Sequence, residues 1–446
     1  MQILLATHFF SPKYSTGTDK YTLGLAQSFK ESGHEVQVIC AEDWQSGDSY
    51  WNGVSEDTYK NIHVHRIHLN WTKADNPNKV LYDSKLVEDW FYNYLKQQNI
   101  DMVHVTSAYT LGVGILRAAN KARKPLVLTL MDFWFACPRI TLLQSNGQLC
   151  NGITSDWECQ NCLLRNNKYY KLTEQIFQTS LLIKFWNFIC QNPKLSRHRF
   201  AKGTALDVYE RKVILQQILT LPDVVISHSN FLKNFYQHIF KSLKVKYLPN
   251  GHDLSWIDNY TRKTVSQKIR IGYIGQISYH KGIHILVDAF VAATKENKAT
   301  LSIWGDISKN SYYDNYLCEY AQNIESIEFR GYFLPHQIGE VLSEIDVIIV
   351  PSLWYENAPL IIFEAFASKT PVIVTNLGGM AEIISYGVNG LLFKQGDVED
   401  LAEQISRLIN EDDLINQLKS GIPIVKDISK EVDELELIYL KILSNN

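Results

Sequence analysis

The sequence of 446 residues lacks the features that mark membrane-spanning, secreted, low-complexity and repeat proteins. Its longest apolar runs are far too short to span a bilayer, and the start MQILLATHFFSP has neither the basic nor the apolar region of a signal peptide. Low-complexity tracts and short repeats are also missing. We therefore expect a globular, cytoplasmic chain.

The sequence also lacks a dinucleotide-binding motif after its first strand and an overall positive charge, and each absence argues against one class of function. The first strand is not followed by GxGxxG, which disfavours a NAD-dependent dehydrogenase. The net charge of −3 argues against nucleic-acid binding. The charge is uneven, however, because residues 163–246 contain 14 Lys or Arg against 4 Asp or Glu, so this stretch carries +10 and the remainder −13. Such asymmetry indicates an anionic partner or surface.

Both halves of the chain alternate short apolar strands with helical periodicity, and the length favours two domains of about 200 residues each. This alternation predicts an α/β protein with two doubly wound parallel sheets. The halves meet near LPNGHD, and residues 431–443 form an amphipathic helix. Strands are expected at residues 1–9, 36–40, 62–68, 102–107 and 125–130, and then at 269–275, 300–305, 327–332, 346–352, 371–375 and 390–393.

Two glutamates flank a predicted helix start in PSLWYENAPLIIFEAFASKTPVIV. Pro359 suits a first helical turn, so Glu356 lies in the preceding loop and Glu364 inside the helix. About 7.5 Å of helix rise lies between Pro359 and Glu364. The two carboxylates therefore suit different parts of one elongated ligand with an anionic centre, such as a nucleotide sugar. Because the helix is apolar on nearly every face, Glu364 needs partners, either ribose hydroxyls or a core Lys, Arg or backbone amide.

Glycine-containing loops lead from strands into helices at three places. In open parallel sheets ligands bind beyond the carboxyl ends of the strands. Gly17, the run Gly275–Gly282 and the pair Gly378–Gly379 each offer backbone N–H groups to a phosphate, although an isolated Gly turn is more often only a turn. None is a GxGxxG or a Walker A motif, so the signal lies in their joint position.

Together these segments resemble the retaining glycosyltransferases of family 4 with the GT-B fold. The resemblance runs nearly end to end and includes GTDKYTLGLAQSFKESGHEVQVI, the NG of LPNGHD, YIGQISYHKGIHILVDAF, SIWGD, EFRGY, the two glutamates, VTNLGGMAEII and NGLLF. It implies two Rossmann-like domains facing a cleft. Residues 1–250 would form the acceptor side and 251–430 would bind the nucleotide sugar, with the helix at 431–446 packing back on the first domain.

The resemblance also implies roles for single residues. Glu356 would contact the hydroxyls of the donor sugar, Glu364 the ribose and Lys281 the diphosphate. Amides of the Gly17 and Gly379 loops would stabilise charge on the diphosphate. Retention in this family usually needs no metal, and in a favoured mechanism the leaving phosphate oxygen helps deprotonate the acceptor hydroxyl on the same face. The loop that lines the sugar and phosphates would be shaped by Asn357, Ala358, Pro359 and Leu360.

Two positions depart from the family pattern. Gln276 stands where many members have an Arg, although its amide still donates hydrogen bonds to a donor. Met131 stands where relatives have a His, and a Met side chain neither donates a hydrogen bond nor accepts a proton. The neighbouring Asp132 either contacts the sugar or the acceptor as a catalytic residue, or only braces the turn after its strand.

Four cysteines lie within 26 residues, in CPRITLLQSNGQLCNGITSDWECQNC. Disulfides are rare in a reducing cytosol, whereas four thiolates suit a tetrahedral zinc ion that pins a long loop. An Fe–S cluster is the lesser metal alternative, and four unligated thiols are the other interpretation. The insert at residues 137–162 is thus expected to hold structural zinc through Cys137, Cys150, Cys159 and Cys162.

A helical, basic segment follows at residues 163–220. Within it aromatic and basic side chains are mixed, namely Lys184, Phe185, Trp186, Phe188, Lys194, Arg197 and Arg199. Such a mixture suits contact with an anionic bilayer or a lipid-diphosphate acceptor. A helical hairpin with core aromatics and solvated charges would show the same pattern.

These features predict transfer of a sugar from a UDP- or GDP-sugar to a glycan or lipid-linked acceptor, in the assembly of surface polysaccharide. No cofactor is expected in catalysis, and the enzyme would work in the cytoplasm or at the inner face of the membrane. A nucleotide-sugar epimerase of the same fold would instead turn over the donor without an acceptor. A catalytically inactive homologue would bind nucleotide and transfer nothing.

Overall fold

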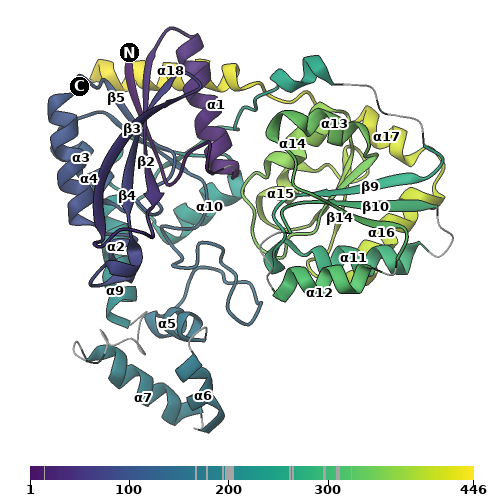
Figure 1. The fold of residues 1–446 in the computed structure, drawn as a ribbon, viewed down its shortest axis with the longest axis horizontal. Helices are drawn as coiled ribbons and strands as arrows, with labels where there is room; N and C mark the ends of the chain where they lie inside the picture. The colour runs from purple at the N-terminus through teal and green to yellow at the C-terminus, as the bar shows by residue number, and fades with distance from the viewer. Residues whose placement is uncertain are drawn as a thin grey trace. The chain divides into compact units, whose positions relative to one another are not determined.

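The computed structural model describes residues 1–14, 16–165, 168–176, 179–192, 195, 205–260, 263, 266–294, 298–307, 312–322 and 324–445. The chain divides into two compact units, each built on a mainly parallel sheet with helices around it (Figure 1). The predicted α/β fold class is confirmed. Unit 1 comprises Met1–His228, Leu232–Pro249 and Glu431–Asn446, and unit 2 comprises Ser229–Phe231 and Asn250–Lys430.

Unit 1 contains an eight-stranded sheet in the order β3-β4-β2-β1-β5-β6-β7-β8. Neighbouring strands are parallel except β3 and β4, which pair antiparallel at one edge. Strands β5 and β6 are buried at every position, as expected where helices cover both faces of a parallel sheet. The strands are β1 Gln2–Thr7, β2 Glu35–Asp43, β3 Trp51–Tyr59, β4 Ile62–Leu69, β5 Met102–Val105, β6 Leu126–Leu130, β7 Val224–Ser227 and β8 Val245–Tyr247.

Strand β3 has no counterpart among the predicted strands. Its sequence WNGVSEDTY is polar, and none of its residues is buried. A solvent-facing edge strand needs no apolar alternation, because its side chains do not enter the core. This strand is held to the sheet by its ladder with β4.

The helices of unit 1 cover the sheet and form an extension away from it. Helices α5 and α7 of the extension both contact α9. A small core inside it consists of Leu164, Tyr170, Leu182, Trp186 and Ile189. The helices are α1 Gly17–Glu31, α2 Pro77–Val80, α3 Lys85–Gln97, α4 Gly114–Lys121, α5 Asp156–Leu164, α6 Lys168–Ile176, α7 Thr179–Gln191, α9 Ala205–Ile218 and α10 Asn230–Ile239.

The final helix, α18 Ile428–Asn445, returns to unit 1 and lies beside its first strands and α1 (Figure 1). Buried polar pairs fix it there. Tyr21 Oη donates to Glu431 Oε1 over 2.6 Å, and Tyr439 Oη lies 2.7 Å from His104 Nδ1. The Tyr439 ring also stacks on Phe29, with ring centroids 5.5 Å apart.

Unit 2 contains a six-stranded, fully parallel sheet in the order β11-β10-β9-β12-β13-β14. Its strands coincide with those predicted and are β9 Ile269–Ile274, β10 Ala299–Trp304, β11 Ile327–Gly331, β12 Val347–Val350, β13 Val372–Thr375 and β14 Gly390–Phe393. Two apolar cores lie on the two faces of this sheet. The helices are α11 Ile283–Ala293, α12 Tyr312–Ala321, α13 Ile338–Ser343, α14 Leu360–Ala367, α15 Gly378–Ile383, α16 Val398–Asn410 and α17 Leu414–Ser420.

Candidate active site

In unit 2 the strand order reverses between β9 and β12, because the chain leaves β9 toward β10 and β11 and then crosses back. Such a switch point is where open α/β sheets bind ligands, beyond the carboxyl ends of the strands. The loop after β9 contains Lys281, and the loop after β12 contains Glu356. Both predicted donor-site residues therefore follow adjacent strands at the point where a ligand is expected.

The loop after β9 is closely packed against the end of β12. Gly282 has φ 72° and a Cβ built there would lie 2.0 Å from the carbonyl oxygen of Pro351. The backbone N–H of Leu353 also donates to the carbonyl of His280 over 2.8 Å. Glycine is required at position 282 both by its left-handed φ and by this close approach, and the two loops are locked together as a result.

Lys281 and Glu356 form an ion pair in which Lys281 Nζ lies 2.6 Å from Glu356 Oε1. The same oxygen accepts from Ser352 Oγ over 3.0 Å and from Trp354 Nε1 over 2.8 Å. Glu356 is only 9% exposed, and burying a carboxylate at this depth requires partners of this kind. Lys281 Nζ also lies 5.4 Å from the centre of the Trp354 ring, within cation–π range.

Two ionisable side chains next to this ion pair, His280 and Tyr273, have shifted pKa values that favour their uncharged forms. Burial and the Lys281 cation lower the pKa of His280, so its imidazole is neutral beside the lysine. Burial and then the Glu356 charge raise the pKa of Tyr273 well above its usual range. The Tyr273 hydroxyl donates to the carbonyl of Gln276 over 2.8 Å and thereby shapes the loop, while the Gln276 residue itself is exposed.

The loop after β13 lies directly on the Glu356 backbone. Gly379 N–H donates to the carbonyl of Glu356 over 2.9 Å, and a Cβ at this position would lie 1.7 Å from the carbonyl oxygen of Asn357. At Gly378, φ is 59° and a Cβ would lie 3.2 Å from the Glu356 carbonyl. The glycine pair thus allows the backbones to approach, and the Gly379 amide holds the glutamate loop in place.

Helix α14 begins at Leu360, with Pro359 as its N-cap residue rather than inside its first turn. One face of the helix is buried, at Ile362, Ala365 and Phe366. Glu364 is half-buried. The apolar sequence of the helix predicted burial on nearly every face, and this prediction is wrong for the side that carries Glu364. Asn357 and Ala358 in the preceding loop are half-buried too.

In unit 1, Gly17 is the first residue of α1, and a capping box closes the helix start. Thr16 N and Oγ1 donate to Asp19 Oδ2 over 2.9 and 2.8 Å. Asp19 is fully buried, and burial raises its pKa to about 6. Its Oδ1 lies 3.8 Å from Nε2 of His8, whose pKa burial lowers to about 4. Sequence reasoning missed this pair, although His8 directly after β1 and the Thr-x-x-Asp spacing at 16–19 are visible signals.

Asp132 braces the turn that follows β6. Its Oδ1 accepts from the backbone N–H of Trp134 over 2.8 Å, and the Tyr236 hydroxyl donates to its carbonyl over 2.8 Å. The buried guanidinium of Arg211 donates to the carbonyl of Trp134 in the same turn. Burial raises the pKa of Asp132 to about 6, so its carboxylate can be protonated or ionised near neutral pH.

The four clustered cysteines line one cavity of about 210 Å³. Cys159 and Cys162 both lie on α5, whereas Cys137 and Cys150 come from the loop before it. Burial raises the pKa of Cys137 to about 11 and also raises the pKa of Cys150 and Cys159. Among the described residues, the four cysteine sulfur atoms do not all lie within 4.8 Å of one another. The potential ligand atoms of Glu56, His63 and His65 do lie within that distance of one another.

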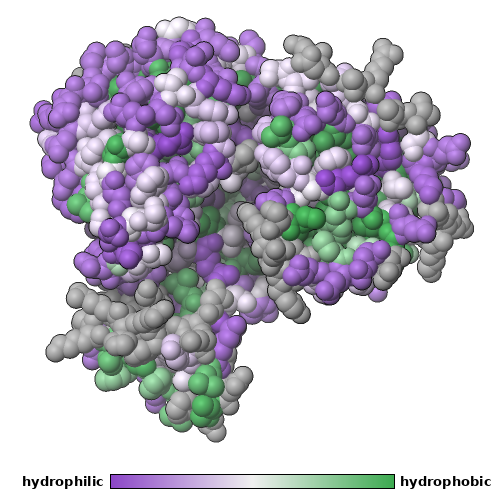
Figure 2. Space-filling view, in the orientation of Figure 1, coloured by the Kyte–Doolittle hydropathy of each residue, from purple (hydrophilic) through white to green (hydrophobic). Residues whose placement is uncertain are grey.

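The aromatic residues of the basic segment divide between core and surface. Trp186 is buried and donates from Nε1 to Thr173 Oγ1 over 2.8 Å. Phe185 and Phe188 are 42% and 64% exposed, and Figure 2 shows hydrophobic side chains gathered on the surface of α6 and α7. Other exposed apolar side chains on these helices are Tyr169, Leu172, Ile176 and Leu181. Lys194, Arg197 and Arg199 lie outside the described residues.

In the part of the chain that the structure describes, no helix combines the length and the apolar content that a membrane span requires.

Two family descriptions match the chain, one in each unit. "Glycosyltransferase Family 4" matches residues 15–149, and "Glycosyl transferases group 1" matches residues 268–411. The second range contains Lys281, Glu356 and the Gly378–Gly379 pair. The first contains Gly17 and Asp132.

Curated relatives match parts of the chain. An uncharacterized glycosyltransferase of Methanocaldococcus jannaschii is 29% identical over 200 residues, which is 42% of this chain and 51% of the relative. The capsular polysaccharide biosynthesis glycosyltransferase CapM of Staphylococcus aureus is 27% identical over 164 residues, 36% of this chain and 42% of CapM. The chain thus spans about half, or less, of the length of these relatives.

The fold as a whole is similar to solved structures. The crystal structure of Anabaena HepE in complex with UDP and glucose has a TM-score of 0.64 to this chain, with 17% identity over 99% of this chain and 100% of HepE. Sucrose-phosphate synthase of Thermosynechococcus elongatus has a TM-score of 0.65 and 15% identity over 100% of both chains. At these identities the similarity concerns the GT-B fold.

Proposed function

Since this chain belongs to the group 1, family 4 glycosyltransferases, we propose that it transfers a sugar, with retention of configuration, from a UDP- or GDP-sugar to a glycan or lipid-linked acceptor. One observation carries the proposal: the Lys281–Glu356 ion pair at the switch point of unit 2. Support for a nucleotide-sugar donor also comes from HepE, which was solved with UDP and with UDP-glucose. The relationship to CapM favours an acceptor in polysaccharide assembly.

The ion pair is compatible with the roles proposed for its two members. A diphosphate brings more negative charge than a single carboxylate and competes with Glu356 for the Lys281 ammonium. When Lys281 turns to the diphosphate, Ser352 and Trp354 still donate to Glu356 Oε1. The carboxylate therefore keeps hydrogen bonds and is held in place to contact the hydroxyls of the sugar, while Glu364 on α14 contacts the ribose.

The chemistry of the proposed reaction is balanced within donor and acceptor. The bond between the sugar C1 and the diphosphate oxygen breaks, and a bond between C1 and the acceptor oxygen forms on the same face. The acceptor proton passes to the leaving phosphate oxygen. Lys281 stabilises the charge that develops on that diphosphate, and no metal takes part. Asp132 is assigned to the acceptor side, where its carboxylate contacts the acceptor or the sugar.

A screen of nucleotide sugars with and without acceptors tests the proposal. Purified protein should release UDP or GDP faster when a suitable acceptor is present, and NMR of the product should show the anomeric configuration of the donor. Conversion of the donor to an epimer without acceptor would instead identify an epimerase. Tight nucleotide binding with no turnover of any donor and acceptor pair would identify an inactive homologue.

We further propose that the four-cysteine pocket holds a structural zinc ion through Cys137, Cys150, Cys159 and Cys162. All four cysteines line one cavity, and binding of zinc would deprotonate thiols whose pKa burial raises. Metal analysis should find zinc whose content falls by about one equivalent per chain in Cys159→Ser and is unchanged in Cys318→Ser. A content below about 0.2 equivalents in the parent, or equal zinc contents in the parent and in Cys159→Ser, contradicts this assignment, and iron with sulfide would indicate an Fe–S cluster.

We also propose that the exposed apolar face of α6 and α7 contacts an anionic membrane. Its support is the combination of exposed apolar side chains with the excess of positive charge at residues 163–246. In a flotation assay at low salt, anionic vesicles should carry the protein with them. The double variant Leu172→Ala, Phe188→Ala should show a smaller bound fraction. Tyr320→Ala, an exposed aromatic in unit 2, serves as control. No binding to anionic vesicles at low salt would refute membrane contact.

A further inference from the structure

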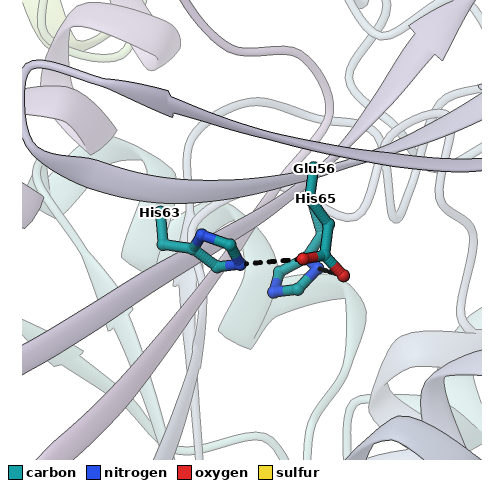
Figure 3. Close-up of side chains that lie close together, drawn as sticks. All are labelled: Glu56, His63 and His65. Atoms are coloured by element: carbon teal, nitrogen blue, oxygen red, sulfur yellow. Dashed lines mark ion pairs between the residues drawn. The ribbon is translucent and has the colours of Figure 1, made fainter.

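The edge hairpin of unit 1 brings two histidines and one carboxylate together on one face. Glu56 of β3 pairs directly with His65 of β4 in the antiparallel ladder, and His63 lies two residues before His65. Alternate residues of a strand point to the same side. Figure 3 shows both imidazoles next to the Glu56 carboxylate, with one ion-pair contact from each ring. Their donor atoms all lie within 4.8 Å of one another.

The spacing of these atoms is that of ligands around one small cation. His63 Nε2 lies 3.4 Å from Glu56 Oε2, and His65 Nδ1 lies 3.4 Å from Glu56 Oε1. Ligands at the usual zinc–nitrogen and zinc–oxygen distances are separated by about 3.4 Å when the geometry is tetrahedral. A direct hydrogen bond would bring each pair closer together.

A chain of hydrogen bonds sets the orientation of the His65 ring. Tyr94 of α3 donates its hydroxyl proton to Gln37 Oε1, and its oxygen lies 3.0 Å from His65 Nε2. With that proton committed to Gln37, the Tyr94 oxygen accepts from His65 Nε2–H. Histidine ligands of metals are commonly oriented in this way by a partner on the second ring nitrogen.

The other nitrogen of His65 is then a lone pair without a hydrogen-bond partner. Nδ1 is buried and lacks such a partner, and the His65 side chain is only 6% exposed. In the tautomer that carries its proton on Nε2, Nδ1 is an acceptor, as a carboxylate oxygen is. Two acceptors that face each other across 3.4 Å are stabilised when a cation lies between them.

We infer that Glu56, His63 and His65 form a binding site for a divalent d-block cation of the zinc class, with three protein ligands and one position open to water or a fourth ligand. Imidazole and carboxylate together suit zinc, nickel, cobalt and copper, whereas magnesium and calcium prefer oxygen alone. Glu56 and His63 are 61% and 43% exposed, so the ion has an entry path from solvent.

The site is separate from the proposed sugar-transfer machinery. His63 and His65 lie near the amino end of β4, which spans Ile62–Leu69, whereas ligand loops follow the carboxyl ends of parallel strands. An ion here joins β3, the exposed edge strand, to β4. It would strengthen the edge of the sheet, where polar side chains contribute little packing.

Cobalt titration of the metal-free protein distinguishes this site from the cysteine pocket. Co²⁺ bound to thiolates gives an intense ligand-to-metal band in the near ultraviolet, whereas Co²⁺ bound by imidazole and carboxylate gives only weak visible bands. The titration and a parallel calorimetric titration with Ni²⁺ should be carried out in the Cys137→Ser, Cys150→Ser, Cys159→Ser, Cys162→Ser background.

In that background we expect one equivalent of Ni²⁺ or Co²⁺ to bind and to raise the melting temperature. His63→Ala and Glu56→Gln should each weaken binding at least tenfold. His68→Ala is the matched control, because His68 lies on the same strand but on the opposite face, and it should bind as the parent does. Absence of binding, or equal binding by the parent, His63→Ala and Glu56→Gln, overturns the inference. If the serine background does not fold, the native chain is used instead: His63→Ala should then bind one equivalent of Co²⁺ less than the parent with an unchanged thiolate band, and equal stoichiometry in the two overturns the inference.

Discussion

Lys281 Nζ lies 2.6 Å from Glu356 Oε1, although the two residues are 75 positions apart in the chain. Their loops follow β9 and β12, which are hydrogen-bonded neighbours at the switch point of unit 2. The proposed donor would place its diphosphate at Lys281 and its sugar at Glu356. The two residues have different proposed roles, and substituting each one separately tests them.

Replacing Lys281 and replacing Glu356 should have different kinetic effects. Lys281→Ala should weaken the affinity for UDP or GDP and lower transfer by about 100- to 1,000-fold, since the diphosphate loses its cation. Glu356→Ala should abolish transfer but leave nucleotide affinity unchanged or higher, because Lys281 no longer has a competing partner. Calorimetric titration with nucleotide and a transfer assay measure the two quantities.

Glu411→Ala is the control for these two variants. It breaks an exposed ion pair with Arg407 on α16, also in unit 2, and should change neither nucleotide affinity nor transfer. All three variants should show the circular dichroism of the parent. A fully active Glu356→Ala would remove the central assignment.

Asp132→Asn should separate catalysis from turn bracing. The asparagine keeps an oxygen for the Trp134 N–H and loses the negative charge, so the turn should persist. We expect transfer to fall about 100-fold, in the range for loss of one polar contact that stabilises the transition state. Near-normal turnover would reduce Asp132 to a bracing residue, as would a loss seen only in Asp132→Ala.

The pH profile of transfer should report the same residue. Burial raises the pKa of Asp132 to about 6, so a role that needs the carboxylate predicts activity that rises as pH increases through about 6. Asp132→Asn should lack that step in kcat while other features of the profile remain. An unchanged profile in the variant would assign the step to another group.

Asp19 should make stability depend on pH. Its folded-state pKa is raised from 3.8 to about 6, so the protonated form stabilises the fold below about pH 4, and this contribution is lost as pH rises through 6. His8 opposes this trend, because its pKa is lowered from 6.5 to about 4 and the unfolded chain therefore binds the additional proton between these values. The difference between the parent and an Asp19 variant isolates the contribution of Asp19. Asp19→Asn keeps an acceptor for Thr16, so its melting temperature should rise relative to the parent between pH 4 and 7. A constant difference across that range would contradict the assigned pKa.

Gly379→Ala tests the close contact between the loops after β12 and β13. The added Cβ would lie 1.7 Å from the Asn357 carbonyl, so we expect destabilisation of roughly 1–3 kcal/mol together with weaker nucleotide binding. Gly387→Ala is the matched control, since φ is 75° there but nothing lies within 4 Å. It should cost about 1–2 kcal/mol and leave nucleotide affinity intact. Denaturant unfolding and nucleotide titration give both values, and equal affinity in the two variants would contradict the packing role.

Much of the fold could be predicted from local pattern, and the exceptions have physical reasons. The strands of unit 2 are short, apolar and bounded by Gly or Pro, so periodicity locates them. Strand β3 escapes such a prediction because its side chains face solvent. Glu364 is half-buried. This degree of burial could not be predicted, because hydropathy does not reveal which side of α14 faces away from the sheet.

The candidate site shows the same division. The order of residues in HKG, in E-x7-E and in the Gly-Gly loop determined which side chains follow which strands and which backbone positions need glycine. Only the tertiary structure decided that Lys281 pairs with Glu356, because the order of parallel strands is set by packing between segments distant in sequence. It also decided that Glu56, His63 and His65 converge, since that requires a register between β3 and β4 that no local pattern specifies.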